Sequence, residues 1–241
     1  MLARTTIADR FIASLQAGSY GLLHTLGKGI GNPTLRGDEM TAYMDHKNLA
    51  NEVIDAARVQ EITDGVHRVL DRVATAEAQA GREVGSVKLL AATKTRDVGE
   101  IMTAIDAGVR MIGENRPQEV TAKVEGLLKQ CAQRGFTLGA ATAEAVAGDV
   151  DGTHIPFHLI GQLQSNKIGK VLPVVNAIES VDSVDLAERI SRRAVARGIT
   201  VGVLLEVNES GEASKSGCDP AHAIRIAQKI GTLDGLELQG L

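Results

Sequence analysis

The hydrophobic and polar positions divide the chain into short apolar runs that alternate with longer amphipathic segments. A helix is predicted over about residues 48–80, because Val, Ile and Leu recur there at three- and four-residue steps. Short apolar runs suit strands that are buried on both faces. They occupy residues 87–93, 109–113, 156–161, 177–181, 200–207 and 236–241. Helices are expected between them, over about 97–107, 117–134, 183–197 and 219–230, with a short one that stops at Pro173.

Six strands that alternate with helices predict a parallel α/β architecture. A (β/α)₈ barrel and an open doubly wound sheet both fit this order. The glycine fingerprint of nucleotide-binding sheets is absent from the first strand–helix turn, which favours the barrel. A barrel needs eight strands, so we expect a TIM-barrel-like domain over residues 47–241 that is truncated after its sixth strand. Residues 135–154 are rich in Gly, Ala, Thr and Asp and are interpreted as a surface insertion.

Residues 1–46 show no strand pattern and are expected to form a mobile N-terminal extension. The net charge is −4 and aromatic residues make up 2% of the chain, which argues against a nucleic-acid partner. No apolar run approaches the roughly 20 residues that span a bilayer, so no membrane partner is expected. Cys131 and Cys218 lie far apart in the sequence and favour free thiols in a reducing compartment. A cytoplasmic location is therefore predicted.

The candidate chemistry begins at Lys94, which ends the apolar run 87–93 and is followed by the helix-start residues Thr95 and Asp97. A lysine at the carboxyl end of a buried strand lies where α/β folds gather their functional groups. Partial desolvation can leave its amine neutral and able to form a Schiff base with a carbonyl compound. A solvated lysine that caps the strand is the alternative, and spacing alone does not decide between them.

Four motifs occur in order along the chain. They are Leu89–Thr95, Gly113–Asn115, Phe157–Lys167 and Val207–Gly217. Together they resemble the pyridoxal phosphate homeostasis proteins (the YggS/PROSC family), which are similar to the barrel domain of alanine racemase. The resemblance covers roughly residues 59–241. It implies the barrel of fold type III, with pyridoxal 5′-phosphate (PLP) bound as a Schiff base to Lys94.

The resemblance also implies two contacts to the cofactor. Asn115 can hydrogen-bond the phenolate oxygen or the ring edge of PLP, with a loop cap as the alternative. His158 either contacts the cofactor or is a buried histidine bonded to the backbone. His154 and His158 have a metal-like spacing, but Pro156 prevents a shared helix face and no third ligand is evident, so no metal site is expected.

Further residues are secondary candidates. Ser165, Asn166 and Lys167 are expected to cap and open a helix near the barrel mouth. Lys215 lies in a polar loop, where it is either a solvated charge or a second, transient amine for the aldehyde. The family's phosphate-binding turns, after the seventh and eighth strands, have no counterpart in residues 1–241, and a phosphate needs such clustered N–H groups.

The predicted function is a carrier that binds and buffers PLP without turnover and hands it to apo forms of PLP-dependent enzymes. The alternative is an amino acid racemase or lyase that uses the same Schiff base. Racemases of this barrel type use a second base, commonly a tyrosine, and the tyrosines here, Tyr20 and Tyr43, lie in the extension. No catalytic residue is therefore assigned. An aldolase-like use of Lys94 agrees less well with the four motifs.

Overall fold

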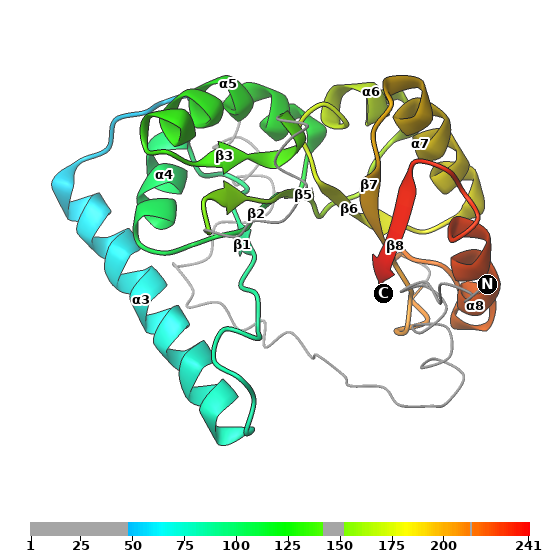
Figure 1. Ribbon diagram of the computed structural model, residues 1–241, viewed down its shortest axis with the longest axis horizontal. Coiled ribbons are helices and arrows are strands. Elements are labelled where there is room, and N and C mark those ends of the chain that lie inside the picture. The colour runs from blue at the N-terminus through cyan, green and yellow to red at the C-terminus, as the bar shows by residue number, and fades with distance from the viewer. Residues whose placement is uncertain (1–47, 142–151, 213) are drawn as a thin grey trace, which may run out of the picture.

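The computed structural model describes residues 48–141, 152–212 and 214–241, so the extension expected over residues 1–46 lies outside the described residues. Within the described part, six parallel strands form one sheet in the order β1-β2-β5-β6-β7-β8. The sheet follows an open arc with helices along one side, and β1 and β8 are its two edges (Figure 1). The strands are β1 Ala91–Ala92, β2 Ile112–Glu114, β5 Phe157–Leu159, β6 Ala177–Val181, β7 Val201–Leu205 and β8 Leu236–Gly240. The parallel α/β prediction is confirmed.

The helices that connect these strands follow the predicted pattern closely. They are α3 Ala56–Gln79, α4 Val98–Asp106, α5 Pro117–Gln133, α6 Ile168–Val171, α7 Val184–Arg197 and α8 Pro220–Ile230, with 3₁₀ turns η1 Gly139–Ala141 and η2 Ser165–Lys167. Local sequence sets the ends of α7, because the Ser183 side chain accepts from the Leu186 N–H and Gly198 adopts the left-handed conformation. The Asp219 side chain caps α8 in the same way.

Each strand divides its side chains between the two faces of the sheet. Neighbouring residues of a strand point to opposite faces, so strands in register share a face at paired positions. One paired row crosses the sheet through Ala92, Gly113, His158, Ala177 and Gly202. This row lies on the inner, concave face. The residues beside it, which include Ile112, Phe157 and Val203, are wholly buried under the helices. The core on the helix side is therefore mostly aliphatic, and the paired row on the concave side carries small residues apart from His158.

Two sequence predictions of local structure were wrong. The run 87–93 pairs only at Ala91–Ala92, because β1 is an edge strand whose one neighbour, β2, is three residues long. The segment 135–154 is not simply a surface insertion. Its ends, β3 Thr137–Leu138 and β4 His154–Ile155, pair in parallel and bury Leu138 and Ile155 in the core, while residues 142–151 lie outside the described residues. A strand of two residues is too short to show an alternation of apolar and polar positions, so the sequence does not indicate β3 and β4.

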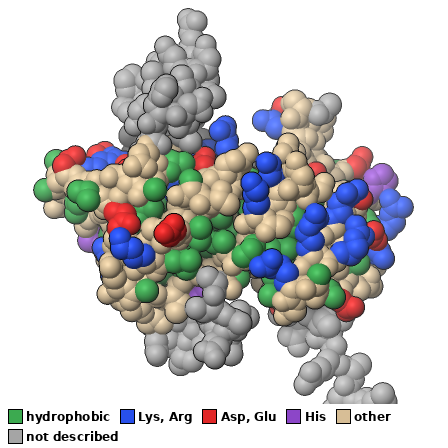
Figure 2. Space-filling view, turned by 90° about the horizontal axis from the view of Figure 1, so that it is seen from above, with side chains coloured by type: hydrophobic (Ala, Val, Ile, Leu, Met, Phe, Trp, Pro, Cys, Tyr) green, Lys and Arg blue, Asp and Glu red, His purple; other side chains and the backbone are tan. Residues whose placement is uncertain are grey.

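Helix α3 lies at one end of the arc and packs on α4 (Figure 1). Its predicted apolar face is only partly covered, since Val59 and Val69 remain about 40% exposed. In contrast, the surface over α7, at the right of Figure 2, gathers Lys and Arg side chains. Acidic residues are interleaved with them, as in the 2.7 Å pair of Arg189 with Asp185, so this face is a solvated charged surface. Within the described residues, no helix is long and apolar enough to cross a membrane.

Candidate functional site

Lys94 lies just after β1, at the carboxyl end of that strand. The Thr93 side chain is buried toward the helices, where it donates to Glu114, so we assign the exposed side chain of the next residue, Lys94, to the concave side. The Lys94 side chain is exposed, and no side chain or backbone group of the described residues accepts a hydrogen bond from it. Its amine is therefore accessible to a ligand on the concave face. The desolvation expected from a barrel mouth is not seen in the described part of the chain.

The turn that carries Lys94 has an unusual backbone. Thr95 has a φ of 66°, in the left-handed region that a β-branched residue rarely adopts. The turn closes with a hydrogen bond from the Arg96 N–H to the Thr93 carbonyl oxygen at 3.0 Å. The Thr95 N–H donates to the Glu119 carboxylate at 3.1 Å. The chain thereby passes from β1 into α4 within a few residues.

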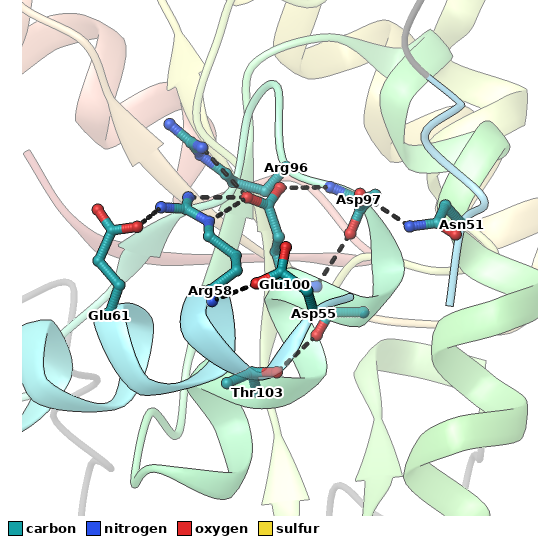
Figure 3. A network of polar contacts seen from close by, with 9 residues as sticks. Asn51, Asp55, Arg58, Glu61, Arg96, Asp97, Glu100 and Thr103 are labelled. Carbon is teal, nitrogen blue, oxygen red and sulfur yellow. Dashed lines mark hydrogen bonds and ion pairs between the residues drawn. The ribbon is translucent and has the colours of Figure 1, made fainter. Parts of the chain in front are cut away.

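A polar network fixes the start of α4 directly after this turn (Figure 3). Asp97 and Glu100 form a capping box, in which each side chain accepts from the backbone N–H of the other residue. Arg58 of α3 donates to the Glu100 carboxylate at 2.7 Å and 2.9 Å, and Asn51 donates to Asp97. This network confirms the helix start predicted at Asp97 and ties it to α3.

A buried ionic cluster of Glu114, Glu119 and Lys123 lies on the other side of the Lys94 turn, between β2 and α5. The Lys123 ammonium lies 2.7 Å from the Glu114 carboxylate and 3.3 Å from that of Glu119. The Thr93 hydroxyl also donates to Glu114, at 2.7 Å. Sequence reasoning missed this cluster, although an acid inside an apolar strand and an acid–lysine pair four residues apart on α5 were visible signals.

The pKa values within this cluster diverge. Burial raises the pKa of Glu114 to about 7, against the opposing attraction of Lys123. One oxygen of Glu114 is buried and has no hydrogen-bond partner among the described residues, which is consistent with poor stabilisation of its charged form. Burial also acts to raise the pKa of Glu119, but its hydrogen bonds and the charge of Lys123 outweigh it and lower that pKa below its ordinary value. The cluster therefore contains one readily ionised carboxylate and one that holds its proton more tightly.

Asn115 follows β2 and comes close to the end of β5. Gly161 makes this approach possible, because a Cβ at that position would overlap the carbonyl oxygen of Asn115. The Asn115 side chain is half-buried, and alternation from Gly113 places it on the concave face. The structure thus brings Asn115 to the same face and the same strand ends as Lys94.

His158 lies in β5 on the concave face, and its side chain is 14% exposed. Its Nδ1 lies 2.7 Å from the carboxylate of Glu179 in β6. The backbone-bonded alternative predicted for His158 is therefore replaced by a side-chain pair. Sequence reasoning missed Glu179, although it is the one charged residue in the apolar run 177–181.

The secondary candidates lie elsewhere. Ser165 and Asn166 line a hollow of about 520 Å³ between the loop after β5 and the start of α7. Its lining includes Asp182 and Asp185 and does not include Lys94, so its charge disfavours a phosphate. Lys167 is in η2, at the start of α6 as predicted.

Lys215 is exposed in the loop after β7, which fits both a solvated charge and a second amine. This loop is joined to the loop after β5 by a hydrogen bond from Gln162 to Ser216. His154 of β4, in contrast, contacts Thr137 of β3 and Asn176 just before β6, away from the strand ends that carry Lys94. Among the described residues, no group of three or more His, Cys, Asp or Glu side chains could hold a metal ion.

The fold and site define a barrel-type α/β protein that presents a lysine amine at the carboxyl end of the first strand of its sheet. Comparisons with known proteins agree with this class, although no protein-family model matches the chain. Pyridoxal phosphate homeostasis proteins of Vibrio cholerae and Pseudomonas aeruginosa are 31% and 33% identical to it over 183 and 180 residues. These matches cover 76% and 75% of this chain and 70% and 68% of the relatives. The chain belongs to the pyridoxal phosphate homeostasis protein family.

Solved structures are similar to this chain as well. A crystal structure of an unknown protein from Bifidobacterium adolescentis is 82% identical, with a TM-score of 0.75, over 81% of this chain and 74% of that one. A structure of PipY from Synechococcus elongatus with PLP bound is 29% identical, with a TM-score of 0.50, over 72% of this chain and 68% of that one.

The residues on the concave face fit an aldehyde ligand. The Lys94 amine forms no ion pair with an acidic side chain of the described residues. Asn115 and His158 supply polar groups from the two following strands of the sheet. Gly113 lies in the strand between those of Lys94 and His158. A Cβ at this position would come within 2.8 Å of the Leu90 and Ile160 side chains. This set fits the carbonyl and ring of a pyridoxal compound.

Proposed function

We propose that this protein binds PLP at the concave face and takes part in PLP homeostasis, with Lys94 as the residue that bonds to it. The observation that carries the proposal is the position of Lys94: an accessible amine at the carboxyl end of β1, on the face that it shares with Asn115 and His158. The names of its relatives and the PLP-bound structure of PipY support this choice of ligand.

PLP brings an aldehyde, whose carbon can form a Schiff base with a primary amine. The neutral amine of Lys94 attacks this carbon through its nitrogen lone pair, and the carbonyl oxygen leaves as water with the two amine protons. The same steps run backwards when water returns, so the ligand is released unchanged. Reversible bonding of this kind suits a protein that buffers a reactive aldehyde.

Two other side chains have supporting roles in this proposal. Asn115 can donate to the phenolate oxygen or a ring substituent of the ligand through its amide. His158 can contact the ring from β5, and its orientation is fixed by the 2.7 Å contact of its Nδ1 with Glu179. Both side chains act by binding and orienting, so the proposal needs no turnover.

The wider role follows from the same binding step. A protein that releases PLP unchanged can supply it to apo forms of PLP-dependent enzymes, and we place this exchange in the cytoplasm. Both cysteines are buried as free thiols, which suits a reducing compartment. We assign ligand binding to residues 47–241 and none of it to residues 1–46.

The test is a titration of the purified protein with PLP, followed by absorbance at roughly 410–430 nm, where a protonated imine of PLP absorbs. Reduction with borohydride and peptide mapping should place the label on Lys94. Lys94→Ala should lose the absorbance, whereas the matched variants Lys167→Ala and Lys215→Ala should keep it. Label found mainly on Lys167 or Lys215 would contradict the assignment. Racemisation of L-alanine at about 1 s⁻¹ or faster would place the protein among the enzymes.

A further inference from the structure

The ionic cluster of Glu114, Glu119 and Lys123, here called the Lys123 cluster, is unusual in its burial. The side chains of Lys123 and Glu114 are wholly buried, and that of Glu119 is 5% exposed. Removing three ionisable groups from water costs free energy that well-packed apolar side chains would not cost. A role beyond packing would explain why this site holds charged residues.

The contacts of the cluster with the backbone indicate that role. The Lys123 ammonium donates to the carbonyl oxygen of Thr93 at 3.0 Å. The Glu119 carboxylate accepts from the N–H of Thr95 at 3.1 Å. Thr93 and Thr95 are the residues on either side of Lys94. The cluster therefore holds the chain immediately before and immediately after the reactive lysine.

The conformation of Thr95 strengthens this point. Its left-handed backbone, with a φ of 66°, is strained for a β-branched residue and persists only where the surroundings enforce it. The bond from its N–H to Glu119 is such a constraint. Because Thr93 is anchored on the helix side of the sheet by Glu114 and Lys123, the intervening Lys94 side chain is left on the concave side.

Lys123 cannot itself be the amine that meets a ligand. It is 0% exposed, and its three hydrogen bonds go to the Thr93 carbonyl and the two glutamates. It lies on the helix side of the turn, whereas Lys94 is exposed. Its position therefore fits a residue that affects ligand binding only by holding the backbone beside Lys94.

We infer that the Lys123 cluster positions Lys94 for reaction with the aldehyde: Lys123 and Glu119 clamp the two flanking residues and thereby present the Lys94 amine on the concave face. This inference rests on the proposed function, since it takes Lys94 as the bonding amine. Glu119 and Lys123 are positioning residues and do not touch the ligand.

A pair of variants at Glu119 separates positioning from charge. Glu119→Ala removes the acceptor for the Thr95 N–H, whereas Glu119→Gln keeps an oxygen that can accept it. We expect Glu119→Ala to lower the second-order rate constant for PLP bonding at Lys94 by about tenfold, the equivalent of one lost charge-assisted hydrogen bond, and Glu119→Gln to lower it by less than about threefold. Absorbance gives the rate, and borohydride trapping confirms the site.

Glu77→Ala is the matched control. The Glu77 carboxylate is also buried and also accepts backbone N–H groups, from Gly85 at 2.9 Å and Val87 at 2.7 Å, but these precede β1 and do not flank Lys94. This variant should lose stability and still bond PLP at the rate of the unmodified protein. A purely structural role for the Lys123 cluster would instead make Glu119→Ala behave like Glu77→Ala.

Hydrogen exchange in the unmodified protein provides a second measurement that needs no variant to fold. The Thr95 amide should exchange at least about tenfold more slowly than an unbonded loop amide. Exchange at the loop rate, an unchanged rate constant in Glu119→Ala, or equal slowing in both Glu119 variants would overturn the inference. These results are distinct from failure of the proposed function, in which trapping in the unmodified protein would miss Lys94.

Discussion

The ammonium of Lys123 and the carboxylate of Glu114 lie 2.7 Å apart at a site where both side chains are wholly buried. An ion pair in this position links the carboxyl end of β2 to α5. It also makes the stability of the protein sensitive to pH, because burial holds the pKa of Glu114 at about 7, above its ordinary value of 4.5.

The first prediction concerns this pH dependence. Between about pH 4.5 and 7, the folded protein retains a proton on Glu114 that the unfolded chain has released. The contribution of Glu114 to the free energy of unfolding is therefore fully present below pH 4.5 and falls as pH rises toward 7, by no more than about 3 kcal/mol. Urea unfolding across this range should show the fall, and Glu114→Gln should flatten it.

Glu119 contributes to stability over a different pH range. Because its pKa is lowered, its contribution to the free energy of unfolding declines only as pH falls below 4.5.

A control for the pH experiment is Glu61→Gln, because Glu61 is 70% exposed on α3 and pairs with Arg58 at the surface. This variant should keep the slope of the unmodified protein. A slope that persists unchanged in Glu114→Gln would show that another group is responsible.

The second prediction concerns the contact between β2 and β5. Gly161→Ala would force a Cβ into the carbonyl oxygen of Asn115, so the backbone must shift, at a cost of about 1–3 kcal/mol. The shift would also displace Asn115 and weaken PLP binding. Gly169→Ala in α6 is the matched control, since nothing lies within 4 Å of its added Cβ, and it should stabilise the protein by about 0.5–1 kcal/mol. Thermal unfolding of both variants checks the difference, and equal melting temperatures would contradict it.

The third prediction concerns the strain at Thr95. Thr95→Gly should raise the free energy of unfolding by about 1 kcal/mol, because glycine adopts a φ of 66° without the clash that a β-branched side chain makes. Thr121→Gly, within α5, should lower it by about 0.5 kcal/mol, as glycine does in a helix. Chemical denaturation measures both. Loss of stability in Thr95→Gly would mean that the threonine side chain contributes more than its backbone strain costs.

The fourth prediction tests the role of His158. His158→Ala should weaken PLP binding about fivefold, the equivalent of one hydrogen bond of about 1 kcal/mol. Glu179→Gln should have a smaller effect in the same direction, because the imidazole remains but loses the carboxylate that orients it. His154→Ala should bind PLP normally, since His154 lies in β4, before the amino end of β5 and away from the strand ends that carry Lys94. If His154→Ala and His158→Ala weakened binding equally, the effect would come from the fold and not from the site.

Much of the local structure was predictable from particular residues. The run 177–181 became β6 with the same bounds, because it is a central strand whose backbone pairs with a neighbour on each side. The start of α7 at Ser183 and its end at Gly198 follow from capping chemistry that involves only neighbouring residues. The edge strand β1 was the exception. Its apolar run predicts a longer strand, but the length of its partner β2 limits the pairing.

The alternation of strands and helices and the place of Lys94 at the end of the first strand could be predicted from the residues alone, since both depend on patterns within a few residues. Which groups meet depends on how the elements pack. Parallel register placed Glu179 beside His158, and the packing of α5 on β2 placed Lys123 behind the turn that carries Lys94. The physical reason is that strand register and helix packing join segments far apart in the chain, whereas the apolar pattern of each segment specifies only which face it buries.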